Sequence, residues 1–184
     1  MIKSLRIAAA VLMTVVSTSA LLVLGPPGTA SAGVLDVTCT PPGSETTTYT
    51  PPLTTAPQAV TISSSTQYGP CASLSNPAIT SGTRSRTTSD PEQTCLDLLD
   101  TGSSTYTITW NTGQTTTISA NRTATVVGAA LVITFTGTVT SGLFTGSTVV
   151  QTNTGPSADV LLCTAGLGTV PGIYAVVTLE ITSV

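Results

Sequence analysis

Half of the carboxylate side chains in this sequence, four of eight, gather around one cysteine. Asp90, Glu92, Asp97 and Asp100 lie in a short segment that contains Cys95. A pair of carboxylates can hydrolyse a glycosidic bond, and carboxylate oxygens are ligands of Ca²⁺. Most Asp and Glu side chains are simply solvated. We therefore favour the interpretation that residues Asp90–Asp100 form an exposed acidic loop. Calcium binding by this loop stays an open alternative.

The residue types on which most enzymes depend are missing. The sequence has no histidine, which excludes Ser-His-Asp and Cys-His nucleophile systems and histidine zinc sites. Its one lysine is Lys3, close to the N-terminus, so Ser-Lys and Schiff-base mechanisms are excluded as well. No glycine-rich phosphate loop joins a strand to a helix. We therefore predict a non-enzymatic protein with no catalytic residues, no cofactor and no metal.

The four cysteines are Cys39, Cys71, Cys95 and Cys163. An even number in an exported chain is typical of two disulfides, and no Cys-x-x-Cys spacing supports a metal site instead. Of the three pairings that four cysteines allow, we predict Cys39–Cys71 and Cys95–Cys163. Cys39 closes the first expected strand and Cys71 follows the next long β segment, so a meander would bring them side by side. Cys95 and Cys163 each adjoin an apolar run.

Positive charge is scarce along the chain. Arg84, Arg86 and Arg122 are the only cations after residue 32, and acidic residues outnumber them. Nucleic-acid binding needs cations that neutralise phosphates, so we predict no nucleic-acid partner, and the same deficit argues against anionic membrane surfaces. Arg84 and Arg86 flank Ser85 on a strand or loop, where we favour a solvated edge over an anion site.

The stretch TYTITWNTGQTTTI, residues 105–118, holds Trp110, the only tryptophan. Tyr106, Ile108 and Trp110 alternate with threonines and therefore share one face of a strand. Trp110 is either a ligand platform or a plug in a hydrophobic core. We favour the core, because buried aromatic side chains dominate core energetics.

The elements that position these residues begin after a signal peptide, which we predict over residues 1–32. A basic start precedes a mostly apolar run over residues 7–24, prolines end the run, and Ala30-Ser31-Ala32 offers small residues for cleavage. We predict cleavage between Ala32 and Gly33. The mature chain, residues 33–184, has the length of one domain, and we expect it to be secreted and free of the membrane.

Apolar and polar residues alternate repeatedly along the mature chain, which predicts antiparallel strands with one solvated face. No segment shows a convincing helical period. Ser141-Gly142, between two β runs, predicts a two-residue turn that would pair Ile133 with Val150 and set Gly137 opposite Gly146. The fold that fits best is all-β: a single antiparallel, immunoglobulin-like β-sandwich with two disulfides. Strands are expected over residues 34–40, 46–50, 58–67, 105–110, 131–139 and 173–181.

Motifs spread over residues 33–184 resemble one group of proteins. They are Cys39, Cys163, "TYTPPLT" (48–54), "YGPCASL" (68–74), "TITWNTG" (107–113), "GTVTSGLFTG" (137–146) and "VTLEI" (177–181). With these the chain resembles the small secreted actinobacterial proteins of uncharacterised function that carry two disulfides on a β-sandwich. The resemblance implies fold, export and disulfides, and it supplies no catalytic residues.

The residues together predict a secreted, monomeric, non-enzymatic protein that binds a partner or forms part of the cell envelope. The residues do not identify the partner, and an envelope glycan and an envelope protein are the two candidates. The runner-up is a carbohydrate-binding module, which would use exposed aromatic residues such as Trp110 on a sheet. A small-molecule carrier with a cavity in its core and a carboxylate-based glycosidase are further alternatives. The ligand itself cannot be read from the sequence.

Overall fold

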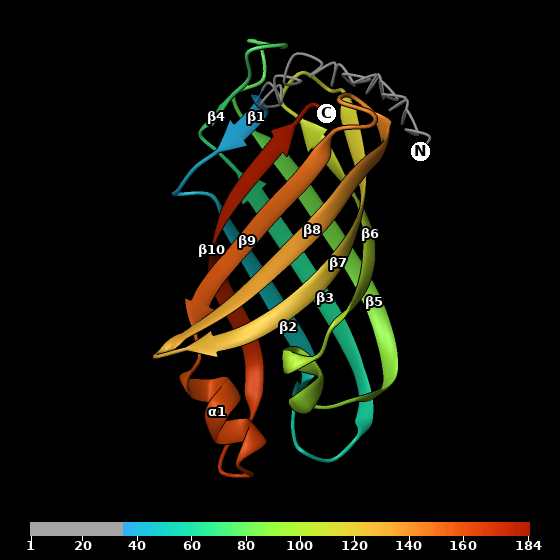
Figure 1. Cartoon of the computed structure of the whole chain (residues 1–184). Helices are drawn as coiled ribbons and strands as arrows, with labels where there is room; N and C mark the ends of the chain where they lie inside the picture. Colours follow the sequence, from blue (N-terminus) through green and yellow to red (C-terminus); the bar gives the residue numbers. More distant parts are fainter. Residues whose placement is uncertain (1–34) are drawn as a thin grey trace, which may run out of the picture. The chain divides into compact units, whose positions relative to one another are not determined.

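The computed structural model describes residues 35–184, which form one continuous antiparallel sheet. The strand order is β2-β3-β5-β6-β7-β8-β9-β10-β1-β4, and β2 also pairs with β10. This extra pairing closes eight of the strands into a barrel, while β1 and β4 extend the sheet beyond β10 (Figure 1). The strands are β1 (Leu35–Cys39), β2 (Ser44–Leu53), β3 (Gln58–Tyr68), β4 (Cys71–Ala72), β5 (Gly82–Gln93), β6 (Gly102–Trp110), β7 (Thr115–Val127), β8 (Ala130–Gly142), β9 (Thr148–Pro156) and β10 (Val170–Thr182).

The closed barrel differs from the immunoglobulin-like sandwich that the sequence led us to expect. The all-β class and the two disulfides are as expected, but the strands do not separate into two packed sheets. The pairing that makes the difference joins β2 to β10, with Thr46 opposite Tyr174 and Glu45 opposite Ala175. Alternating residues are needed equally by barrels and sandwiches, so the pattern alone could not separate the two.

Threonine and serine cover most of the outside of the barrel wall, and larger side chains point inward. On β6, for example, Tyr106, Ile108 and Trp110 are buried while Thr105 and Thr107 are exposed. A β-branched side chain suits a wet strand face, and the apolar residues of each strand are removed from water on the other face. The alternation along each strand therefore decides which of its side chains face the interior of the barrel.

Two apolar clusters fill the ends of the barrel. The upper cluster, named for the position of β1 at the top of Figure 1, contains Val37 of β1 together with Trp110 and Leu179 among others. The lower one lies near two short helices and contains Leu53, Leu98 and Val160. These helices are η1 (Leu96–Leu99), a single turn, and α1 (Ala158–Thr164). The middle of the barrel, between the clusters, carries polar side chains instead.

The two disulfides fasten the ends of the barrel. Cys39 of β1 is bonded to Cys71 of β4, and Cys95, just before η1, is bonded to Cys163 of α1. Both pairs are the predicted ones, but Cys39 meets Cys71 because β4 pairs directly with β1 at the end of the sheet, and not through the meander that we expected. The helix α1 was not expected, because seven residues are too few to show a helical period against the flanking strands.

The connection between β8 and β9 differs from the predicted two-residue turn. Ser141 and Gly142 still pair with β7, and the chain turns later, over residues 143–147. Ile133 is therefore opposite Asn153 instead of Val150, and Gly137 is opposite Val149 instead of Gly146. The shift moves Val150 to the outer face, where it is exposed. A turn with Phe144 at φ 64° is hard to foresee, because only small or polar residues commonly adopt that conformation.

The predicted signal peptide, residues 1–32, and its cleavage point between Ala32 and Gly33 lie outside the described residues. Within residues 35–184, no helix is long and apolar enough to cross a membrane.

Candidate functional site

Trp110 lies in the upper apolar cluster. Its side chain is 2% exposed, its Nε1 donates a hydrogen bond to Thr116 Oγ1 at 2.7 Å, and its ring meets Phe144 edge-on at 6.2 Å. A ligand platform needs a ring face that is open to solvent, and Trp110 has none. The structure therefore places Trp110 in the core, and the ligand-platform alternative does not fit.

The acidic residues around Cys95 are dispersed. Asp97 accepts hydrogen bonds from the Thr94 amide and hydroxyl at 2.6 and 2.8 Å, and Asp90 accepts one from the Glu92 amide at 3.0 Å. Among residues 35–184, no three His, Cys, Asp or Glu side chains converge as metal ligands would. The segment is thus the end of a strand followed by a helical turn, and the carboxylates of Asp90 and Asp97 accept hydrogen bonds from residues two or three positions away.

The charged side chains of the barrel wall are concentrated on its inner face. Arg84, Arg86 and Asp90 occupy the inward positions of β5, opposite Thr66, Ser64 and Val60 of β3. Glu45 of β2 and Arg122 of β7 also point inward, opposite Ala175 and Phe135. Strand β5 has no apolar residue at all, so the sequence pattern gave no sign of which of its faces is internal.

A hydrogen-bonded network centred on Glu45 crosses the middle of the barrel. Arg84 forms an ion pair with Glu45, and these side chains are only 10% and 13% exposed. Glu45 also accepts from Thr66 Oγ1 at 2.6 Å and from Asn153 Nδ2 at 3.0 Å. The network satisfies a carboxylate that would otherwise be costly to bury.

The network continues through Gln151 to two tyrosines. Gln151 Nε2 donates to Asn153 Oδ1 at 2.8 Å, and Gln151 Oε1 accepts from Tyr68 and Tyr106 at 2.9 and 3.0 Å. Burial raises the pKa of Tyr106 to about 12 and raises the pKa of Tyr68 further. Both phenols therefore stay neutral at physiological pH and act as hydrogen-bond donors.

Arg84 keeps its charge within this network. Burial alone lowers the pKa of Arg84, but Tyr68 and Glu45 raise it, and the net shift is upward. The guanidinium carbon lies 4.5 Å from the centre of the Tyr106 ring, in cation–π contact. Its Nε is buried and has no hydrogen-bond partner. Arg84 thus brings a fixed positive charge to the place where β5 approaches β6.

The barrel wall opens between β5 and β6. The two strands pair only at Gly82 with Trp110 and at Thr83 with Thr109, although both strands continue well beyond this point. A side chain at Gly82 would collide with the Trp110 ring, since its Cβ would lie 2.8 Å from that ring. Glycine therefore allows the last close contact before the strands part.

A hollow of about 320 Å³ lies where the strands part, and we call it the side hollow. A second hollow of about 340 Å³ follows β2, β3 and β5 and shares Ser64 and Arg86 with the first. A third, of about 130 Å³, lies deeper, beside Arg122, and shares Glu45 and Thr47 with the second. The side hollow is lined by Ser64, Arg84, Ser85, Arg86, Thr105, Tyr106 and Thr107.

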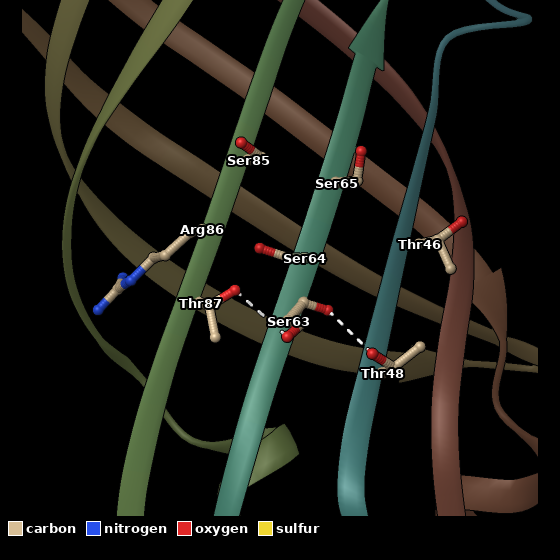
Figure 2. Close-up of a pocket in the computed structure, with 8 residues that line it drawn as sticks. All are labelled: Thr46, Thr48, Ser63, Ser64, Ser65, Ser85, Arg86 and Thr87. Atoms are coloured by element: carbon tan, nitrogen blue, oxygen red, sulfur yellow. Dashed lines mark hydrogen bonds between the residues drawn. The ribbon is translucent and has the colours of Figure 1, made fainter.

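Arg122 closes off the lower part of the interior. Burial lowers its pKa, and its guanidinium donates to the backbone oxygens of Asp100 and Leu98. Arg86 contrasts with it. This side chain is exposed, forms no ion pair among the described residues, and extends from β5 away from β3 in Figure 2.

The outer face of β2, β3 and β5 carries a shallow groove of about 330 Å³, which we call the outer groove. Figure 2 shows its hydroxyl side chains, with Thr48 donating to the Ser63 carbonyl and Ser63 bonded to Thr87. No aromatic residue lines it. Its lining is Thr46, Thr48, Ser63, Ser64, Ser65, Ser85, Arg86 and Thr87.

No protein-family model, curated protein or solved structure matches this chain. Two guanidiniums, several hydroxyls and a neutral tyrosine surround an opening in the barrel wall, an arrangement suited to holding a polar molecule. The sequence pattern pointed to Arg84 and Arg86 but favoured a solvated edge, and no local pattern connects Glu45, Tyr106 or Gln151 with them.

Proposed function

We propose that this protein is a secreted, non-enzymatic binding protein that holds a small polar molecule in the side hollow. The observation that carries the proposal is the hollow where β5 and β6 part, lined by Arg84, Arg86 and Tyr106 from the inner face and by Ser85, Thr105 and Thr107 from the outer face. An eight-stranded barrel is wide enough to hold one small ligand. A hollow of about 320 Å³ falls at the lower end of the range for ligand pockets, roughly 300–1,000 Å³.

The chemistry of the interior favours binding over catalysis. Glu45 is fully engaged by Arg84, Thr66 and Asn153, so it is not free to act as a base. Tyr106, whose pKa burial raises to about 12, is a poor proton donor in a reaction at neutral pH. These groups are arranged to hold a ligand in place.

Secretion is part of the proposal. Two disulfides are typical of an oxidising compartment, and residues 1–32 have the pattern of a signal peptide. Export also agrees with the resemblance to small secreted actinobacterial proteins.

A carbohydrate-binding module that uses a flat aromatic platform has less support. Trp110 is buried, and Tyr174 is the one aromatic residue of the described chain that is mainly exposed, at 56%. The outer groove offers hydroxyls and one guanidinium, Arg86, but no aromatic ring. Modules of that kind rely on aromatic rings to stack against sugars, so we place the binding site inside the wall.

The proposal is tested by filling the side hollow. Ser64→Phe would put a ring into the hollow, while Ser65→Phe would put the same ring on the outer face of the same strand. A library of sugars, sugar acids, amino acids and organic acids is screened against the oxidised protein by ligand-observed NMR. We expect at least one compound to bind the wild type and Ser65→Phe, but not Ser64→Phe. Equal binding to both variants, or no binding to the wild type, would contradict the proposal.

A further inference from the structure

The side hollow has an excess of positive charge. Arg84 and Arg86 both line it, and no carboxylate is among its lining residues. Arg84 is neutralised by Glu45 through one terminal nitrogen, whereas Arg86 has no ion pair in the part of the chain that the structure describes. A guanidinium offers five N–H donors and matches a carboxylate or phosphate through two of them. A ligand with a negative group would complete this arrangement.

Hydroxyl groups make up most of the remaining lining. Ser64, Ser85, Thr105 and Thr107 surround the arginines, and each hydroxyl can both donate and accept. Such a surface suits a ligand that also carries several hydroxyls. The hollow has room for more than a bare inorganic ion, since about 320 Å³ equals the space of about ten water molecules at roughly 30 Å³ each.

We infer that the side hollow binds a small hydroxylated carboxylate, the chemistry of a sugar acid, with the carboxylate at Arg86 and the hydroxyls on Ser64, Ser85, Thr105 and Thr107. This inference rests on the proposed function and adds the class of ligand. Arg84 holds Glu45 and Tyr106 in position through its ion pair and its cation–π contact. Its positive charge adds to that of Arg86 without direct contact with the carboxylate. Arg86 makes the direct contact, because it is exposed and unpaired while Arg84 is enclosed.

The test compares three sugars that share a ring and differ in charge: D-glucuronate, D-glucose and D-glucosamine. Titration calorimetry on the oxidised full chain measures each dissociation constant at low salt. We expect glucuronate to bind about tenfold or more tightly than glucose, the gain typical of a charge-assisted hydrogen bond, and glucosamine to bind most weakly. Equal affinity for glucuronate and glucose, or tighter binding of glucosamine, would overturn the inference.

Arg86→Gln isolates the proposed carboxylate contact. Because Arg86 has no ion pair to lose, the variant should fold as the wild type does. The affinity for glucuronate should fall by about tenfold, while the affinity for glucose should be unchanged. Thr154→Glu, on the outer face of β9, alters the net charge by the same single unit and serves as the control. An equal loss in both variants would show a long-range charge effect and overturn the assignment of Arg86.

The two proposals fail in different ways. If glucuronate does not bind but another library compound binds the wild type and not Ser64→Phe, the ligand class is wrong and the proposed function stands. If no compound distinguishes Ser64→Phe from Ser65→Phe, the proposed function is itself contradicted.

Discussion

At the scale of single residues, Trp110 shows how packing and one hydrogen bond fix a side chain. Its ring lies against Phe144 and over Gly82, and its nitrogen is satisfied by Thr116. We expect Trp110→Ala to lower the free energy of unfolding by about 3–5 kcal/mol, because the cavity adds to the lost transfer energy. Urea denaturation measures the loss, and the wild-type fluorescence should be blue-shifted and resist acrylamide. Free quenching together with unchanged stability would contradict the buried position.

The ion pair inside the barrel makes a second prediction at this scale. Glu45→Gln leaves the Arg84 charge without its partner in a mostly buried place. We expect a loss of about 3–5 kcal/mol in the free energy of unfolding, the usual effect of removing one partner from a buried pair. Glu180→Gln, which removes an exposed carboxylate from the outer face of β10, is the matched control and should change stability little. Similar urea midpoints for the two variants would argue against a buried pair.

Residue types alone predicted some of these roles. Both cysteine pairs are as predicted, although β1 lies between β10 and β4 and not in the expected meander, and the buried Trp110 followed from alternation on β6. The contact between Arg84 and Glu45 could not be predicted. Glu45 and Arg84 lie on β2 and β5, two strands apart, and meet only because their side chains point into the same closed space.

At the scale of elements, the close approach of β7 and β8 depends on Gly137. A Cβ there would lie 2.0 Å from the Ser119 carbonyl oxygen and 2.6 Å from Ala120 Cα. We expect Gly137→Ala to destabilise the protein by at least about 1–3 kcal/mol through forced backbone shifts. Gly102→Ala is the control, because a Cβ at Gly102 would meet nothing within 4 Å. Thermal denaturation compares the two, and equal melting temperatures would refute the close approach.

Strand β5 explains why the candidate site was difficult to find from sequence. Its inward positions carry Arg84, Arg86, Thr88 and Asp90 in place of apolar residues, so the period-2 signal that identifies a strand is absent. The same polar composition creates the hollow. In contrast, β6, β8 and β10 have buried apolar residues at alternate positions, and the sequence predicted all three.

At the scale of the whole molecule, the closure of the barrel depends on contacts between distant segments. Strand β2, near the start of the described residues, pairs with β10, which lies at their end. No local sequence pattern specifies a pairing between strands so far apart in the sequence. The sequence therefore predicted the class, the disulfides and most of the strands, but not whether the strands form one closed sheet or two packed ones. The turn after β8 was misplaced for a related reason, because its register is set by pairing with β7 and β9.

Closure of the barrel also buries tyrosine side chains, and we therefore expect the free energy of unfolding to fall at alkaline pH. Burial raises the pKa of both Tyr49 and Tyr106 to about 12, against about 10 in an unfolded chain. The stabilisation is complete below about pH 10 and is lost as pH rises toward about 12, because only the unfolded chain releases these protons readily in that window. Urea midpoints should hold steady from about pH 8 to 10 and fall above it. A midpoint that stays constant through about pH 11 would contradict the buried phenols.

The central claim is that the protein binds its ligand where β5 and β6 part. Amide chemical-shift mapping with the tightest-binding library compound tests it most directly, because each backbone N–H reports its own surroundings. We predict that the largest shifts fall on residues 84–87 of β5 and 105–107 of β6, with smaller ones at Ser64, while the outer face of β8 and β9 is unchanged. Residues 85–87 also line the outer groove, so Arg84 and residues 105–107 decide between the two sites. Shifts at Thr46, Thr48 and Ser63 of the outer groove, or along the outer threonine rows, with none at Arg84 and residues 105–107, would contradict it.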